Sequence, residues 1–166
     1  MVANARVPLA REIAASLQPQ LDGLVRTARE VSDEIERFFH ALGDFVERYQ
    51  AGQSEHDRRL RLTDAVRHDP GWSTIEVSWD QVAGRLREIV AVLVWAAGEW
   101  EGISEEEIPE RDEVATELEV LIRTGHELIE RVLGAIANPS PDTIYWLTRN
   151  VANGDVAISA APLHVG

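Results

Sequence analysis

The chain has 166 residues and a formal net charge of −13, from 29 acidic residues against 16 basic residues that are all arginine. This length suits one domain with a substantial core. The acidic balance excludes strong binding of nucleic acid over the whole surface, because that affinity comes mainly from basic groups. The chain has no cysteine, which excludes disulfides, cysteine-based zinc sites and cysteine-ligated iron–sulfur clusters within it.

The hydropathy of the chain gives no sign of a membrane protein. No apolar run approaches the ~18 residues that a membrane-spanning helix needs, and no charged-then-apolar leader opens the sequence. We therefore expect a cytoplasmic protein without membrane contact.

The N-terminal part of the chain predicts a short helix followed by a long one. Leu9, Ile13 and Leu17 are four residues apart and predict a short helix that Pro19 should end or kink. In residues 21–49, apolar side chains recur at steps of three and four, which indicates a long helix packed against partner helices.

Two further long helices are expected in the middle of the chain. Ser78 and Gln81 form a capping box that predicts a helix start, preceded by a strand-like segment at residues 74–77. The third helix is expected to begin at the acidic run of residues 104–107, because the helix dipole favours acid there. It should end before the proline-rich residues 138–141.

The C-terminal residues predict a β-hairpin. Residues 143–149 are rich in β-branched and aromatic side chains, residues 155–161 run back, and Asn153-Gly154 supplies a turn between them. A lone hairpin is marginal in water, so this one needs a sheet or a helix to cover it. Alternation gives the first strand two apolar faces, with Ile144, Trp146 and Thr148 on one and Tyr145 and Leu147 on the other.

Together these patterns predict a mainly α fold. We expect an antiparallel bundle of three long helices plus a shorter N-terminal helix, with a C-terminal β-hairpin. Residues 60–63 are also strand-like, between the first two long helices.

The hairpin carries a family resemblance. Tyr145-Trp146-Leu147 with Arg149, and the run from Gly154 to Gly166, resemble the segment that ends the arch insertion of DinG-type (XPD-like) superfamily 2 DNA helicases. The run from Arg58 to Thr63, followed by Trp72, resembles the middle of the same insertion less specifically.

The resemblance implies a function that belongs to a longer parent protein. The chain has neither a G-x-x-x-x-G-K-[ST] nucleotide loop nor a D-E-A-H run, so we expect no catalysis by this fragment alone. ATP, magnesium and the iron–sulfur cluster typical of the family would be held elsewhere in the parent. Residues 1–19 would return from the motor domain, residues 20–141 would form the helical arch-like domain, and residues 142–166 would lead back into the motor.

The parent would be an ATP-dependent helicase that moves 5′ to 3′, with this insert helping to enclose the path of single-stranded DNA. The expected partners are the motor and cluster domains of the parent chain and the single-stranded DNA. Because an insert leaves and re-enters its host at nearby points, Leu9 and Ile158 are expected to be neighbours. The alternative is a freestanding helical adaptor whose long apolar seam binds a partner helix.

The densest basic cluster in the chain is the candidate DNA contact. It consists of Arg58, Arg59, Arg61 and Arg67, with Trp72 nearby. Arginine binds phosphate and an aromatic ring stacks on a base, which is how single-stranded DNA is commonly held. The alternative is that these arginines pair with acids of the same stretch, namely Glu55, Asp57, Asp64 and Asp69.

No catalytic or metal site is expected in the chain. His126 and Glu130 lie in a near match to the H-E-x-x-H zinc helix, but a zinc site needs a further ligand and a cleft, and a solvated helix face is the better explanation of the pattern. Glu36 and His40 are four residues apart, yet the Glu-x-x-His sets of a di-metal bundle do not occur. The G-x-S-x-G motif of a serine nucleophile is also missing.

Overall fold

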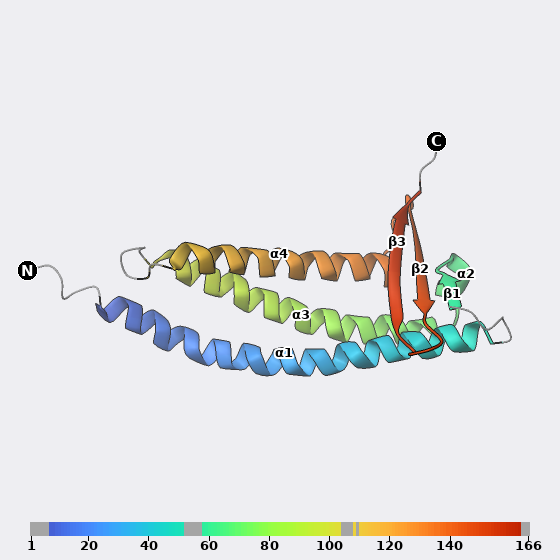
Figure 1. The fold of residues 1–166 in the computed structure, drawn as a ribbon, viewed down its shortest axis with the longest axis horizontal. Helices are drawn as coiled ribbons and strands as arrows, with labels where there is room; N and C mark the ends of the chain where they lie inside the picture. Colours follow the sequence, from blue (N-terminus) through green and yellow to red (C-terminus); the bar gives the residue numbers. More distant parts are fainter. Residues whose placement is uncertain (1–6, 52–57, 104–107, 109, 164–166) are drawn as a thin grey trace, which may run out of the picture. The chain divides into compact units, whose positions relative to one another are not determined.

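The computed structural model of the protein describes residues 7–51, 58–103, 108 and 110–163, without the side chains of residues 7–10 and 58. Helices dominate these residues, and a small antiparallel sheet contains the C-terminal hairpin (Figure 1). The predicted mainly α fold with a C-terminal hairpin is therefore confirmed. In chain order the elements are α1 (Val7–Tyr49), β1 (Arg58–Arg61), α2 (Asp64–Arg67), α3 (Trp72–Glu101), α4 (Arg111–Ile136), β2 (Thr143–Arg149) and β3 (Val156–Pro162).

The chain divides into two compact units, and each long helix contributes a segment to both. Unit 1 comprises residues 1–31 and 85–127, and unit 2 comprises residues 32–84 and 128–166. The secondary-structure elements of unit 1, in its described residues, are segments of α1, α3 and α4. Unit 2 combines the remaining segments of α1, α3 and α4 with α2 and the sheet.

The first helix differs from the prediction at Pro19. α1 is continuous from Val7 to Tyr49 with Pro19 inside it, so the expected separate N-terminal helix is wrong. A proline within a helix leaves the carbonyl four residues earlier without its N–H donor. Ala15 and Pro19 are both exposed, so water can hydrate that carbonyl and the helix continues through the proline.

The second long helix, α3, begins earlier than predicted. Residues 74–77 belong to α3 and not to a strand, and Ser78 and Gln81 lie inside the helix, so the predicted capping box is wrong. The start is fixed by Asp69, whose Oδ1 accepts the Gly71 N–H at 2.8 Å and whose carbonyl accepts the Trp72 N–H at 2.9 Å. Burial of one helix face here outweighs the strand preference of the β-branched residues.

α4, in contrast, begins later than expected, at Arg111. The acidic run of residues 104–107, predicted as its start, lies outside the described residues.

Aromatic contacts between α1 and α3 form the core of unit 2. The ring centroids of Phe38 and Trp79 are 5.5 Å apart, and those of Phe45 and Trp72 are 5.2 Å apart. These four side chains are at most 3% exposed, and Leu42 between the two phenylalanines is fully buried. The apolar seam predicted for the first long helix is therefore confirmed in this unit.

The predicted hairpin gains a third strand. β1 pairs antiparallel with β2, and β2 pairs antiparallel with β3, which gives the strand order β1-β2-β3. The hairpin loop closes through Asn150, which donates its N–H to the Asp155 carbonyl and accepts the Gly154 N–H, both at 2.8 Å. Gly154 has a φ of 78°, a conformation that glycine adopts without steric cost.

One face of the sheet is anchored on the helices of unit 2. Leu147 is fully buried and Tyr145 is nearly so. A Cβ added at Gly134 of α4 would lie 3.0 Å from the Tyr145 hydroxyl, and one added at Gly43 of α1 would lie 3.2 Å from Val156 Cγ2. The two glycines thus let the helix backbones approach the sheet, and this contact supplies the cover that the hairpin needs.

The described contacts of the hairpin with α1 lie near the C-terminal end of that helix. They involve Gly43 and Glu47, whose Oε2 is 3.4 Å from Arg149 Nη2. The sequence indicated the stretch around Leu9 as the neighbour of Ile158. Leu9 belongs to unit 1 and its side chain lies outside the described residues, so the observed hairpin contacts give that expectation no support.

Candidate nucleic-acid interface

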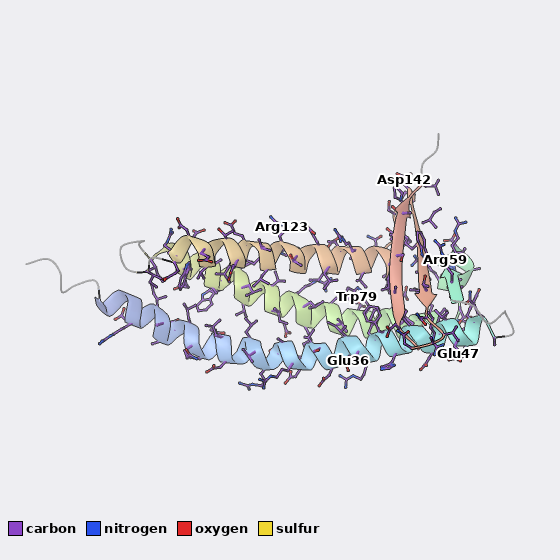
Figure 2. All side chains as sticks on the ribbon, viewed as in Figure 1. Glu36, Glu47, Arg59, Trp79, Arg123 and Asp142 are labelled. Atoms are coloured by element: carbon purple, nitrogen blue, oxygen red, sulfur yellow. The ribbon has the colours of Figure 1, made fainter. Side chains whose placement is uncertain are left out.

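The sheet face opposite the helices carries two arginines and a tryptophan. Arg61 lies opposite Trp146 and Arg59 lies opposite Thr148 in the β1–β2 register, and side chains of directly opposed residues share a face. Arg59 and Arg61 are exposed and Trp146 is half-buried; Figure 2 labels Arg59 beside the strands. We call the surface formed by Arg59, Arg61 and Trp146 the outer face.

Arg59 is held against Trp146. Its guanidinium carbon lies 4.2 Å from the centroid of the indole ring, well inside the ~6 Å range of a cation–π interaction. This contact fixes the orientation of the guanidinium and covers one side of the ring. The pair therefore presents a positively charged planar guanidinium that lies on the indole ring of Trp146.

The arginines of the outer face are not neutralised by the acids that the structure describes. Among the described residues, the ion pairs include Arg85–Glu88, Arg111–Asp112 and Arg149–Glu47, and none is found for Arg59 or Arg61. Of the acids expected to pair with the basic cluster, Glu55 and Asp57 lie outside the described residues. Asp69 instead accepts the Gly71 N–H.

A depression of about 420 Å³ adjoins Arg61. Its lining brings two cations together with four residues that carry hydroxyl groups, which suits an anion, although one carboxylate opposes it. The polar side chains that line it are Arg61, Thr63, Asp64, Arg67, Ser140, Thr143 and Tyr145.

Trp72 is a core residue, and its predicted role as a stacking platform is wrong. The side chain is fully buried, and its Nε1–H donates to the Ile136 carbonyl at 3.1 Å. Arg67 Nη1 donates to the same carbonyl at 2.7 Å. Because the last carbonyls of a helix lack intrahelical donors, Arg67 and Trp72 together satisfy the C-terminal end of α4.

Arg67 has both a structural role and a place beside the depression. Its guanidinium carbon is 5.9 Å from the ring centroids of Trp72 and Tyr145. Burial lowers the pKa of Arg67, while the nearby Tyr145, Asp64 and Glu76 act in the opposite direction. Its Nη2 is buried without a hydrogen-bond partner among the described residues.

The structure therefore divides the predicted cluster. Arg59 and Arg61 share the outer face, whereas Arg67 and Trp72 serve mainly to join α2 and α3 to α4. The backbone of Arg58 pairs with Arg149, and its side chain lies outside the described residues. Trp146 was not predicted as a contact, although strand alternation had placed it on the face opposite Tyr145 and Leu147.

The described residues contain no group of three or more histidine, cysteine or acidic side chains that could hold a metal ion. Glu36, His40, His126 and Glu130 are all exposed. None of the helices in the described ranges combines the length and the apolar character needed to cross a membrane.

Comparison with known proteins gives no relative. No protein-family model, no curated protein and no solved structure matches this chain.

Proposed function

We propose that the chain is the arch-like insert of a DinG-type, ATP-dependent 5′–3′ DNA helicase of the cytoplasm, and that its outer face contacts single-stranded DNA. The observation that carries the DNA contact is the placement of Arg59, Arg61 and Trp146 on one exposed sheet face. The resemblance of the hairpin sequence to the end of the arch insertion supports the helicase assignment. ATP hydrolysis would belong to the motor domain of the parent.

The outer face combines the two features that hold single-stranded nucleic acid. Exposed arginines neutralise phosphates, and a planar guanidinium or aromatic surface stacks on a base. Arg59 lies on Trp146, so a base would stack on the guanidinium plane with the indole beneath it. Arg61, opposite Trp146 in the register, would bind the neighbouring phosphate.

The rest of the chain limits the strength of this contact. With a net charge of −13, it repels phosphate over most of its surface. A local basic face on an acidic body suits a wall that guides a moving strand, since a translocating motor needs contacts that release easily.

The experiment is a fluorescence-anisotropy titration of a labelled 20-nucleotide oligothymidylate with the full chain at low salt. Non-specific affinities of this kind fall at a Kd of roughly 1–100 μM at physiological salt. We expect the weak end of that range at physiological salt and tighter binding at the low salt of this titration. Arg59→Ala with Arg61→Ala should weaken binding by about tenfold or more, since each lost phosphate contact lowers the electrostatic affinity. Trp146→Ala should weaken it further by removing the stacking platform.

The matched control carries the same change in net charge elsewhere. Arg87 of α3 and Arg123 of α4 are both exposed, and Arg87→Ala with Arg123→Ala should change the affinity much less. Equal losses of affinity for the two double variants would show that only net charge matters and would contradict the assignment of the interface to the outer face.

The helicase assignment itself is tested by the coding sequence that surrounds this chain. A nucleotide-binding loop upstream and a further motor motif downstream in the same reading frame are expected. A frame without them would leave the freestanding adaptor as the better interpretation, whatever the DNA titration shows.

A further inference from the structure

The two edges of the three-stranded sheet differ in how their backbone groups are satisfied. At the β1 edge, Gln50 Nε2 donates to the Arg59 carbonyl at 2.8 Å, and the Thr63 N–H donates to the Arg61 carbonyl at 3.0 Å. Both carbonyls on this edge are thus occupied by groups from the chain itself. These two carbonyls are therefore not available to another strand.

The backbone groups at the β3 edge point away from the sheet. The Leu62 N–H donates to the Tyr145 carbonyl at 2.9 Å, so Tyr145 directs its backbone groups towards β1. Because successive residues of an antiparallel strand alternate between their two neighbours, Trp146 bonds to β3, where it pairs with Ser159. The β3 residues that face outwards are therefore Val156, Ile158 and Ala160, followed by Pro162.

The backbone groups of this outward row have no hydrogen-bond partner among the described residues. None of the backbone or side-chain hydrogen bonds found there involves the outward N–H or carbonyl groups of Val156, Ile158 or Ala160. Pro162, the next outward residue, has no N–H and ends the row. An unpaired row of this kind is a template for an added strand.

An apolar groove of about 670 Å³ lies beside the same strand. Phe39 of α1 and Leu128, Val132 and Ala135 of α4 line it together with residues 156–160 of β3. Leu128 is 45% exposed. A strand added about 4.8 Å from β3 would direct every second side chain towards these residues, so the groove selects apolar side chains at alternate positions.

The charges around the groove favour a basic occupant. Glu130 and Arg131 line the groove, and Glu36 and Asp155 line a depression that shares Phe39 and Val156 with it. The acids outnumber the arginine here, and the whole chain carries a net charge of −13. A second copy of the chain would bring the same negative charge to this edge and be repelled.

We propose that the β3 edge binds an extended polypeptide segment of a partner, with apolar side chains at alternate positions and basic residues at its ends, as an additional antiparallel or parallel strand. Main-chain hydrogen bonds to Val156, Ile158 and Ala160 supply the affinity, and the groove and its acids select the sequence. This inference does not depend on the outer face or on the helicase assignment.

The probe is a fluorescent, capped peptide of sequence Arg-Thr-Val-Thr-Val-Thr-Val-Arg, titrated with the full chain at low salt. We expect saturable binding, with weaker binding of the same peptide when glutamate replaces both arginines. Replacement of two valines by proline should abolish binding, because proline cannot donate to the ladder. Equal binding of the proline peptide would overturn the proposal.

Two variants of the protein and one control localise the peptide. Ala160→Pro removes one outward N–H at a position equivalent to that of Pro162, and Leu128→Glu places a charge in the groove; each should weaken binding about threefold to tenfold. Leu121→Glu is the matched control on α4, since Leu121 is 54% exposed and does not line the groove. Equal affinities for Leu128→Glu and Leu121→Glu would overturn the assignment to the groove.

Amide hydrogen exchange followed by NMR reads the edge directly. In the free protein, the amides of Ala157, Ser159 and Ala161 should be protected and those of Val156, Ile158 and Ala160 should exchange quickly. Saturating peptide should slow exchange of the second set selectively. Unchanged exchange at saturation would contradict the proposal, as would protection that rises with protein concentration alone, since a second copy would then occupy the edge.

Discussion

The guanidinium carbon of Arg59 lies 4.2 Å from the centroid of the Trp146 ring, although the two residues are far apart in the chain. The contact exists because β1, which precedes α3 and α4, pairs with β2, which follows them. It creates a charged stacking surface whose two parts hold each other in place. The outer face is therefore preorganised before any ligand binds, which lowers the entropy lost on binding.

The first prediction concerns the salt dependence of single-stranded DNA binding. If Arg59 and Arg61 supply the phosphate contacts, log Kobs should fall with log salt concentration with a slope of about −1.4, the value for two contacts on a single strand. Titrations between low and physiological salt measure the slope. A slope of similar size in the Arg59→Ala, Arg61→Ala variant would place the phosphate contacts elsewhere.

The second prediction separates a core role for Trp72 from a role in binding. Trp72→Phe keeps an aromatic ring but removes the Nε1–H that donates to the Ile136 carbonyl. The free energy of unfolding should fall by about 1–3 kcal/mol, because a buried acceptor loses a partner and a cavity forms. Urea denaturation measures this change.

Trp95 provides the control for that substitution. It lies on the same helix and is 37% exposed, so Trp95→Phe should change stability by less than about 0.5 kcal/mol. The folded Trp72→Phe protein should bind single-stranded DNA as tightly as the original chain. A lower affinity for single-stranded DNA without a loss of stability would show that Trp72 contributes to DNA binding.

The third prediction concerns the close approach of α3 and α4 in unit 1. A Cβ added at Gly125 would lie 2.7 Å from Val90 Cγ2, and Val90 is buried with a stiff β-branched side chain. Gly125→Ala should destabilise the protein by about 1 kcal/mol, because overpacking of roughly 1–3 kcal/mol exceeds the helix-propensity gain of about 1 kcal/mol.

Two further variants test the cause of that loss. Adding Val90→Ala should make the Gly125→Ala substitution neutral or stabilising, a coupling that a double-mutant cycle measures. Gly98→Ala in α3 meets nothing within 4 Å and should stabilise the chain by up to about 1 kcal/mol. If Gly125→Ala were as stabilising as Gly98→Ala, the helices would not be in tight contact at this point.

The fourth prediction concerns the proline inside α1. Pro19 is exposed and lies within the helix, so Pro19→Ala should stabilise the helix by up to about 3 kcal/mol. The expected result is a higher urea midpoint and slower amide exchange in the first turns of α1. Gln20→Ala, at an exposed neighbouring position, should have little effect. A loss of stability on Pro19→Ala would mean that the proline is needed where it is.

The sequence by itself determined the elements whose signal is local. The apolar spacing of residues 21–49 predicted the buried positions Phe38, Leu42 and Phe45, and alternation with a turn predicted β2 and β3 almost to their ends. These features depend on residues within a few positions of each other, so periodicity and turn chemistry are enough to find them. Helix starts were less well predicted. Asp69 fixes the start of α3 through its hydrogen bonds, whereas the capping-box pattern of Ser78 and Gln81 indicated a later start.

Only the tertiary structure decided which of the clustered residues meet on a surface. Arg59, Arg61, Arg67 and Trp72 are close in sequence, yet the first two lie on the outer face while Trp72 enters the core. Trp146 joins the arginines because β1 pairs with β2 although three helices lie between them in the chain. Such pairing depends on the burial of Leu60 and Leu147 on the other face of the sheet, a long-range balance of apolar contact that no local pattern encodes.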